Sequence, residues 1–232
     1  MTASFAILRV LALVAIGAAV VGQLMHSIAF WQSQGVQNLA FQVLNFFSFF
    51  TIESNVLSVF VLTIAVFFWR AKNHPQWLNL LRAIATTFMA TTGIVYALLL
   101  RGVELPQGAT LVWSNEILHV VGPLWMIADW LFGPGRSRLE WKHIGTIVAF
   151  PVGWAAYTLI RGPFAIDERF DAPWYPYPFL NPDLSPNGYL SVLFYVILIA
   201  AVIGLMGAAV IRVSRSRFGL RGQDAPAVTV SV

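Results

Sequence analysis

Six long apolar segments constrain the fold of this chain more than any other feature of its sequence. A helix that crosses a lipid bilayer needs about 20 mostly apolar residues. Only 10% of the 232 residues are charged, whereas soluble domains carry about 25%. The sequence therefore predicts an all-α integral membrane bundle, a single domain over residues 1–221 with six transmembrane helices. The predicted spans are roughly Phe5–His26, Phe46–Trp69, Trp77–Leu100, Trp113–Phe132, His143–Ile160 and Gly188–Ile211.

Charges in the connections predict the orientation. Basic residues gather in alternate connections and after the last span: Arg70, Lys72 and Arg82; Arg136, Arg138 and Lys142; Arg212, Arg215, Arg217 and Arg221. The opposite face has Arg101, Arg161 and Arg169, offset by Glu104, Asp167, Glu168, Asp171 and Asp183. The positive-inside rule then places both termini in the cytoplasm. We expect a multi-pass protein of a cell membrane, with residues 222–232 as a short disordered cytoplasmic tail.

Composition excludes several functions. The net charge of +4 does not indicate nucleic-acid binding, because the basic residues separate apolar runs and set topology. The absence of cysteine excludes disulfides, thiolate metal sites and a cysteine nucleophile. The first apolar run follows Arg9 without an A-x-A cleavage site, so we interpret it as a retained helix rather than a signal peptide.

Polar residues interrupt the start of the second span, in "FFSFFTIESN". A buried polar group costs free energy unless it finds a partner. Helical spacing places Ser48, Thr51, Asn55 and Ser58 on one stripe. Glu53 lies about 200° around the helix from Thr51 and points away from it.

The fourth span contains a second polar cluster around His119. Asn115 is its i−4 neighbour and Glu116 its i−3 neighbour, so either residue is placed to orient the imidazole. Pro123 lacks the N–H that would bond the His119 carbonyl, which predicts a kink. Irregular backbone at membrane depth is tolerated where it faces protein or a cavity, so we expect His119 to face the bundle interior.

The two clusters lie at one depth. Thr51 follows Phe46 by five residues and His119 follows Ser114 by five, about 7–8 Å below the outer end of each span. An ionisable residue inside a membrane indicates a functional site, although a threonine by itself is typical of helix packing.

Threonine and histidine together suggest nucleophilic catalysis. A threonine hydroxyl becomes a useful nucleophile when a base removes its proton, and histidine is the usual base. We hypothesise that Thr51, with His119 as its base, attacks the ester carbonyl of a lipid-like substrate and forms an acyl-enzyme, with the Asn55 and Asn115 amides donating to the oxyanion. No G-x-S-x-G motif is present. The alternative is a non-catalytic protein that binds or transports lipids or small molecules.

Other residues have weaker interpretations. His26, one turn after Gln23, could pair with His119 as a haem or metal ligand, but nothing else marks such a site, and we expect no metal or cofactor. Arg161 and Tyr157 could bind a carboxylate or phosphate, or Arg161 could snorkel. Asp129 is expected to pair with Arg136 or Lys142. The "WYPYPFL" run is either an interfacial aromatic anchor or a lid.

Three motifs carry a family resemblance. "FFTIESN", "NEILHVVGPLWMIADWLF" and "RGPF…WYPYPFL" resemble, in order and spacing, the bacterial six-span Pr-six-Pr proteins. A more distant similarity is to the eukaryotic androgen-induced membrane proteins, a family that hydrolyses fatty acid esters of hydroxy fatty acids with a threonine nucleophile and a histidine. This resemblance implies the same roles for Thr51, after an aromatic-rich helix start, and for His119, in an Asn-x-x-x-His-x-x-x-Pro pattern with Asn115 and Pro123.

Overall fold

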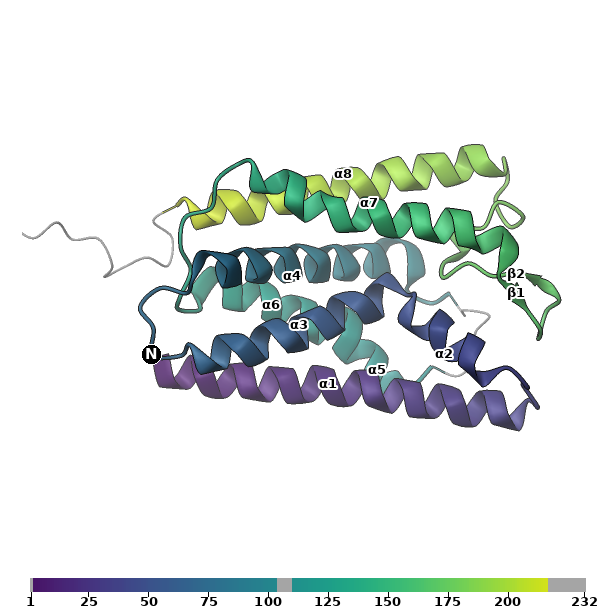
Figure 1. Cartoon of the computed structure of the whole chain (residues 1–232), viewed down its shortest axis with the longest axis horizontal. Coiled ribbons are helices and arrows are strands. Elements are labelled where there is room, and N and C mark those ends of the chain that lie inside the picture. Colours follow the sequence, from purple (N-terminus) through teal and green to yellow (C-terminus); the bar gives the residue numbers. More distant parts are fainter. Residues whose placement is uncertain (1, 104–109, 217–232) are drawn as a thin grey trace, which may run out of the picture.

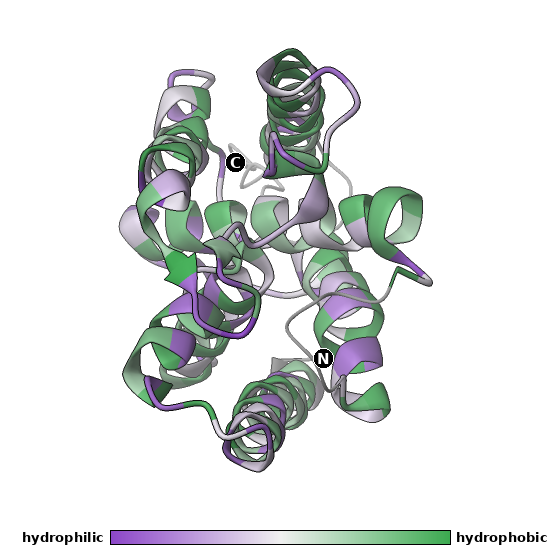
Figure 2. Ribbon diagram, turned by 90° about the vertical axis from the view of Figure 1, so that its right-hand side faces the viewer, coloured by the Kyte–Doolittle hydropathy of each residue, from purple (hydrophilic) through white to green (hydrophobic). Residues whose placement is uncertain are grey.

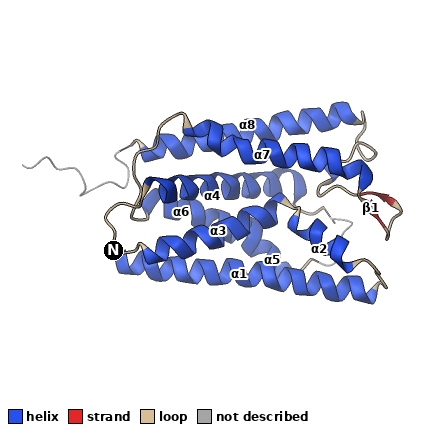
Figure 3. Ribbon diagram, in the orientation of Figure 1, coloured by secondary structure: helices blue, strands red, loops and turns tan. Residues whose placement is uncertain are grey.

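The computed structural model describes residues 2–103 and 110–216 and shows an all-α bundle (Figures 1 and 3). Its α-helices are α1 (Thr2–Ser33), α2 (Leu39–Phe47), α3 (Phe50–Phe67), α4 (Gln76–Val95), α5 (Val112–Glu116), α6 (Gly122–Phe132), α7 (His143–Arg161) and α8 (Tyr189–Ser214). Two π-helical turns are η1 (Tyr96–Leu100) and η2 (Ile117–Val121), and two 3-10 turns are η3 (Gly162–Phe164) and η4 (Pro178–Leu180). A short antiparallel hairpin, β1 (Ile166–Asp167) and β2 (Ala172–Pro173), pairs Ile166 with Pro173.

Five helices of the described chain are long and apolar enough to cross a membrane, which confirms the expected membrane fold. They are Ala3–Ser33, Phe50–Phe67, Gln76–Leu100, His143–Phe164 and Tyr189–Ser214. The fourth predicted span is not one helix. It consists of α5, η2 and α6 in succession, because the Gly122 N–H bonds the Ile117 carbonyl across a π turn and Pro123 has no N–H to donate.

Successive passes run in opposite directions along the bundle (Figure 1). The N-terminus and the end of α8 therefore lie at one end, which we call the terminal end. Helix α2 and the β hairpin lie at the other, the loop end. The cytoplasmic location of the terminal end stays a prediction. Of the residues used to predict it, Glu104, Arg217, Arg221 and the tail 222–232 lie outside the described residues.

The second predicted span begins later than expected. The run from Leu39 to Phe47 forms the separate helix α2, whose N-cap Asn38 accepts a hydrogen bond from the Phe41 N–H at 3.0 Å. The chain turns at Ser48 and Phe49 before α3 begins at Phe50. Thr51 thus lies in the first turn of α3, and Ser48 is not on the same helical stripe, contrary to the prediction.

The outer surface of the bundle is apolar. Leu98, Leu124 and Leu205 are between 62% and 75% exposed, which suits helices surrounded by acyl chains. Figure 2, which looks at the loop end, shows predominantly hydrophobic helices joined by hydrophilic connections. Two hydrophobic clusters form the interior, one around α1, α3 and α6 and one around α4, α7 and α8.

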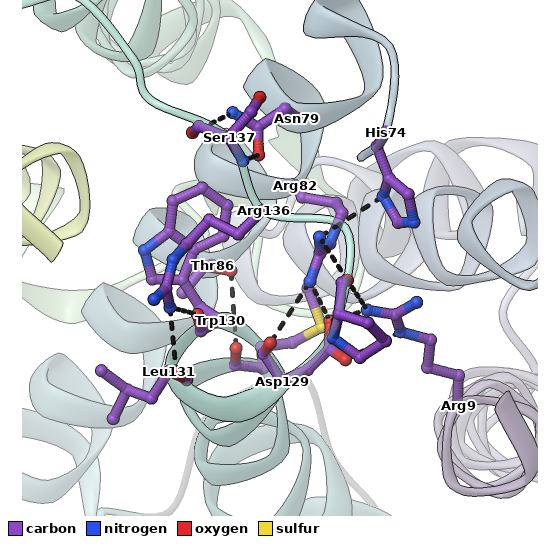
Figure 4. Close-up of polar contacts among 12 residues, drawn as sticks. Arg9, His74, Asn79, Arg82, Thr86, Asp129, Trp130, Leu131, Arg136 and Ser137 are labelled. Carbon is purple, nitrogen blue, oxygen red and sulfur yellow. Dashed lines mark hydrogen bonds and ion pairs between the residues drawn. The ribbon is translucent and has the colours of Figure 1, made fainter. Parts of the chain in front are cut away.

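A buried ion cluster joins three helices near the terminal end (Figure 4). Arg9 of α1 and Arg82 of α4 donate to the two carboxylate oxygens of Asp129 in α6, at 2.7 and 2.8 Å. The expected pairing of Asp129 with Arg136 or Lys142 was wrong. Arg136 donates instead to the carbonyl oxygens of Trp130 and Leu131, and Lys142 pairs with Glu140 at the surface.

His74, in the connection before α4, belongs to the same cluster. Its Nδ1 lies 3.3 Å from Arg82 Nη1. Burial and the neighbouring Arg82 charge lower the pKa of His74 to about 3, so the ring is neutral and accepts a hydrogen bond from the guanidinium. The cluster thereby holds α1, α4 and α6 together. Because η2 leads directly into α6, the cluster also constrains the position of this π turn.

Candidate active site

Thr51 and His119 meet inside the bundle. Thr51 Oγ1 lies 3.3 Å from His119 Nε2, and the threonine is only 6% exposed. Thr51 is held at the start of α3 and His119 in the η2 turn, on passes that are far apart in the sequence. The structure thus brings together the two residues that polarity and depth singled out.

The surroundings of His119 define its tautomer. Its Nδ1 lies 3.0 Å from the backbone oxygen of Asn115, which can only accept a hydrogen bond. Nδ1 therefore carries the proton of the neutral ring, and Nε2 presents its lone pair to Thr51. The ring also stacks on Tyr96, with centroids 4.3 Å apart and planes at 25°. His119 is thus held as a base that faces the threonine hydroxyl.

Tyr177 completes a directed chain of hydrogen bonds. Its hydroxyl oxygen accepts from the Thr51 N–H and lies 3.2 Å from Thr51 Oγ1. Burial raises the pKa of Tyr177 to about 12, so the hydroxyl keeps its proton. Since His119 Nε2 has no proton, the consistent arrangement is that Tyr177 donates to Thr51 Oγ1 and Thr51 donates to His119. The threonine proton therefore already points at the base.

Tyr177 was missed as a site residue, although its segment was noted. Trp174, Tyr175 and Tyr177 are each 5–6% exposed, and Phe49 packs edge-on against the rings of Trp174 and Tyr177. The "WYPYPFL" run therefore folds into the protein, as the lid interpretation requires, rather than standing at its surface as an anchor. The only sequence signal was a dense set of aromatic residues and prolines in the longest connection.

The two asparagine side chains donate hydrogen bonds to protein groups near the site. Asn55 Nδ2 donates to the carbonyl oxygens of Thr51 and Leu118, at 2.8 and 3.1 Å. Asn115 Nδ2 donates to the Tyr96 hydroxyl at 2.8 Å. Because both Asn55 amide protons are directed at protein carbonyls, we do not retain its expected oxyanion role. Asn115 uses one of its two amide protons for Tyr96 and lines the polar cavity, so its oxyanion role stays a prediction. Asn55 instead ties α3 to the η2 turn, and Asn115 orients His119 through its carbonyl and through Tyr96.

Close packing around the π turn requires small residues. A Cβ at Gly122 would lie 2.9 Å from both the Ile117 oxygen and the Met89 side chain. A Cβ at Gly93 of α4 would lie 3.3 Å from the His119 oxygen. These glycines let α4 approach η2 closely enough for Tyr96, the first residue after α4, to cover the imidazole.

The side chains of Ser48 and Glu116, also predicted as site residues, make no hydrogen bond to Thr51 or His119 in the part of the chain that the structure describes. Ser48 ends α2, donates to the Leu44 oxygen and lies 3.0 Å from the Tyr157 hydroxyl of α7. No hydrogen bond joins the Glu116 side chain to His119 within the described residues, and the hydrogen bond that orients the ring goes to the Asn115 carbonyl. Their expected supporting roles near the substrate are therefore not retained.

His26 and Arg161 are also elsewhere. His26 lies on the exposed face of α1 and is not among the residues that line the cavity containing His119, so it is not placed to share a ligand with His119. Arg161 donates to Asn45 Oδ1 at 2.7 Å, and its guanidinium lies over the rings of Phe41 and Trp174. Within residues 2–103 and 110–216, no group of three His, Asp or Glu side chains gathers into a metal site.

Two cavities meet at the site. The polar cavity, about 430 Å³, lies among α1, α2, α3 and η2 and is lined by residues that include Gln23, Ser27, Gln42, Asn45 and His119. The apolar cavity, about 280 Å³, lies among α3, α4, α7 and α8 and is lined mainly by aliphatic and aromatic side chains. Thr51, Leu100 and Tyr177 line both cavities, so the threonine hydroxyl lies where the two spaces adjoin.

Comparisons of the chain with protein-family models, with curated proteins and with solved structures find no match.

Proposed function

We propose that this protein is an intramembrane hydrolase of lipid esters, with Thr51 as nucleophile and His119 as general base. The observation that carries the proposal is the 3.3 Å contact between Thr51 Oγ1 and a histidine nitrogen whose lone pair faces it. The resemblance to androgen-induced membrane proteins assigns the same two residues. The expected setting is a bacterial cell membrane, with both termini in the cytoplasm.

Acylation follows from the directed hydrogen bonds. Thr51 Oγ1 attacks the ester carbonyl carbon while its proton moves to His119 Nε2. The carbonyl electron pair collects on oxygen in the tetrahedral intermediate. When the carbonyl reforms, the bond to the alcohol oxygen breaks, and His119 returns the proton to that oxygen. The products of this half-reaction are the free alcohol and an acyl ester on Thr51.

Deacylation repeats these steps with water. A water oxygen attacks the acyl carbon, and His119 Nε2 accepts the proton that the water loses. The intermediate collapses with cleavage of the bond to Thr51 Oγ1, which takes the proton back from His119. The carboxylic acid leaves, and both residues return to their starting protonation states.

The helix start and Tyr177 supply stabilisation for the oxyanion. The N-terminus of an α-helix carries a partial positive charge and N–H groups that lack intrahelical partners. Thr51 lies in the first turn of the 18-residue helix α3, so negative charge develops beside this dipole. The Tyr177 hydroxyl lies 3.2 Å from Thr51 Oγ1, so once the threonine oxygen is esterified this hydroxyl can donate to the oxyanion beside it.

The alternative is a protein that binds or transports lipids or small molecules without catalysis. The two cavities favour it as a second candidate, since they would hold a ligand whether or not a covalent step follows. The two functions differ in one measurable property: only the hydrolase has an activated hydroxyl that reacts covalently with an electrophile.

A fluorophosphonate probe tests this difference. We expect the purified full-length protein to be labelled at Thr51, and labelling to be lost in Thr51→Ala and in His119→Ala. Matched controls are Thr63→Ala, in the same helix but away from both cavities, and His143→Ala, at the surface. Folded protein that remains unlabelled and hydrolyses no fatty ester would favour the binding protein.

A further inference from the structure

The polar cavity contains buried polar atoms with unused hydrogen-bonding capacity. Gln42 and Asn45 of α2 both line it and are 1% and 2% exposed. Within the described chain, Gln42 Oε1 and Asn45 Nδ2 have no hydrogen-bond partner. One is an acceptor and the other a donor. Since a buried polar atom without a partner costs free energy, the pair indicates a ligand that both donates and accepts, as a hydroxyl group does.

The described lining of the same cavity is uncharged. The described residues that line it include no Asp, Glu, Lys or Arg. Arg161 donates to Asn45 Oδ1 but is not among the lining residues, and aromatic rings of Phe41 and Trp174 flank it. A phosphate or carboxylate buried here would lose its hydration without gaining an ion pair. The cavity is therefore suited to an uncharged polar group.

The apolar cavity has the opposite character. Helix α8 contributes Val196, Ile199 and Ile203, and α7 contributes Ala155 and Leu159. The Thr92 hydroxyl in its wall already contacts Ser54 at 3.1 Å. Burying a methylene group in such a space is favourable by about 0.8 kcal/mol, so an acyl chain is the part of an ester that this cavity stabilises.

We propose that the two cavities divide the substrate at Thr51, with the acyl chain in the apolar cavity and an uncharged, hydroxyl-bearing alcohol part in the polar cavity. This inference rests on the proposed function and narrows its substrate class to single-chain esters of neutral polyols, of the monoacylglycerol type. The leaving alcohol and the incoming water then share the polar cavity, on the side of Thr51 where His119 lies.

Tryptophan quenching tests the orientation without depending on hydrolysis. Trp154 lines the apolar cavity and Trp31 the polar one. The probe is a non-hydrolysable 1-O-alkylglycerol ether with bromine atoms at the end of its chain. We expect it to quench the wild-type protein and Trp31→Phe, and the saturable quenching to be lost in Trp154→Phe. Loss in Trp31→Phe instead, or no saturable quenching of the wild type, would overturn the proposal.

A matched pair of ligands tests the charge preference. We expect the alkylglycerol ether to displace the brominated probe at a concentration more than tenfold below that of the same ether carrying a phosphate on its glycerol. Equal potency of the two would contradict an uncharged alcohol part. This comparison also separates a neutral headgroup from an anionic phospholipid.

Chain-length selection gives the third test. Ala155→Phe adds a ring inside the apolar cavity, whereas Ala149→Phe adds the same ring at an exposed position of α7. We expect Ala155→Phe to lower kcat/KM for a dodecanoyl glycerol ester more than tenfold further than kcat/KM for the butanoyl ester. Ala149→Phe should behave as wild type. An equal loss for both chain lengths would overturn the division.

The hydrolase function and the division of the substrate between the two cavities can be tested separately. Oriented binding of the ether without hydrolysis of any ester would exclude the hydrolase and keep the division of the cavities. Hydrolysis without oriented binding or chain-length selection would keep the hydrolase and exclude the division.

Discussion

Among the single residues of the site, Tyr177 allows a substitution that removes only its hydroxyl group. It contacts both the backbone nitrogen and the hydroxyl of Thr51. Tyr177→Phe keeps the ring that packs on Phe49 but removes the donor that orients Thr51. We expect kcat to fall by about 100-fold, the scale typical of an oxyanion donor, with about 1 kcal/mol lost in stability. Steady-state hydrolysis and thermal unfolding measure the two effects. Tyr195→Phe, on α8, is the control, and an unchanged kcat in Tyr177→Phe would remove Tyr177 from the mechanism.

Polarity at one depth was enough to predict that Thr51 and His119 belong together, because topology limits which side chains share a level of the bilayer. The partners of these residues were not predictable in the same way. Tyr177 comes from a long connection, and Tyr96 from a π turn after α4. Nor could sequence show that the Asn55 amide would be used by two backbone carbonyls.

At the scale of elements, the η2 turn decides where His119 points. Gly122→Ala would place a methyl group 2.9 Å from the Ile117 oxygen and the Met89 side chain. We expect the turn to shift, with a stability loss of about 1–3 kcal/mol from overpacking and weaker probe labelling of Thr51. Gly153→Ala, on α7, has no atom within 4 Å of the added carbon and serves as control. Full labelling of a destabilised Gly122→Ala protein would show that His119 does not depend on this turn.

The ion cluster around Asp129 joins three helices, α1, α4 and α6. Asp129→Asn leaves two buried guanidinium groups without their counter-charge. We expect a loss of about 3–5 kcal/mol in the free energy of unfolding, typical of breaking a buried pair. Glu140→Gln, in the exposed pair with Lys142, should change it little. Denaturation of both variants in detergent micelles checks the contrast, and equal stability would mean that the cluster does not hold the helices.

Element boundaries illustrate why some predictions failed. The residues of α2, "LAFQVLNFF", are as apolar as a span, so hydropathy could not show that the chain turns at Ser48. Pro123 did indicate irregular backbone, but not that it takes the form of a π turn. Arg82 was treated as a topology signal and Arg9 only as the residue before the first apolar run. Their pairing with Asp129 depends on the packing of three passes.

For the whole molecule, the open question with the sharpest test is whether α5, η2 and α6 cross the membrane together. The chain has no cysteine, so single cysteines can be introduced without background. Gln37, Lys142 and Asp183 are exposed in three different connections. With six passes and a cytoplasmic N-terminus, an impermeant maleimide added to intact spheroplasts should label Gln37→Cys and Asp183→Cys but not Lys142→Cys. If α5, η2 and α6 instead returned to the outer side without crossing, Lys142→Cys would be labelled and Asp183→Cys would be protected. Lysed spheroplasts, in which all three should react, are the control, and labelling of Lys142→Cys alone would reverse the orientation while keeping six passes.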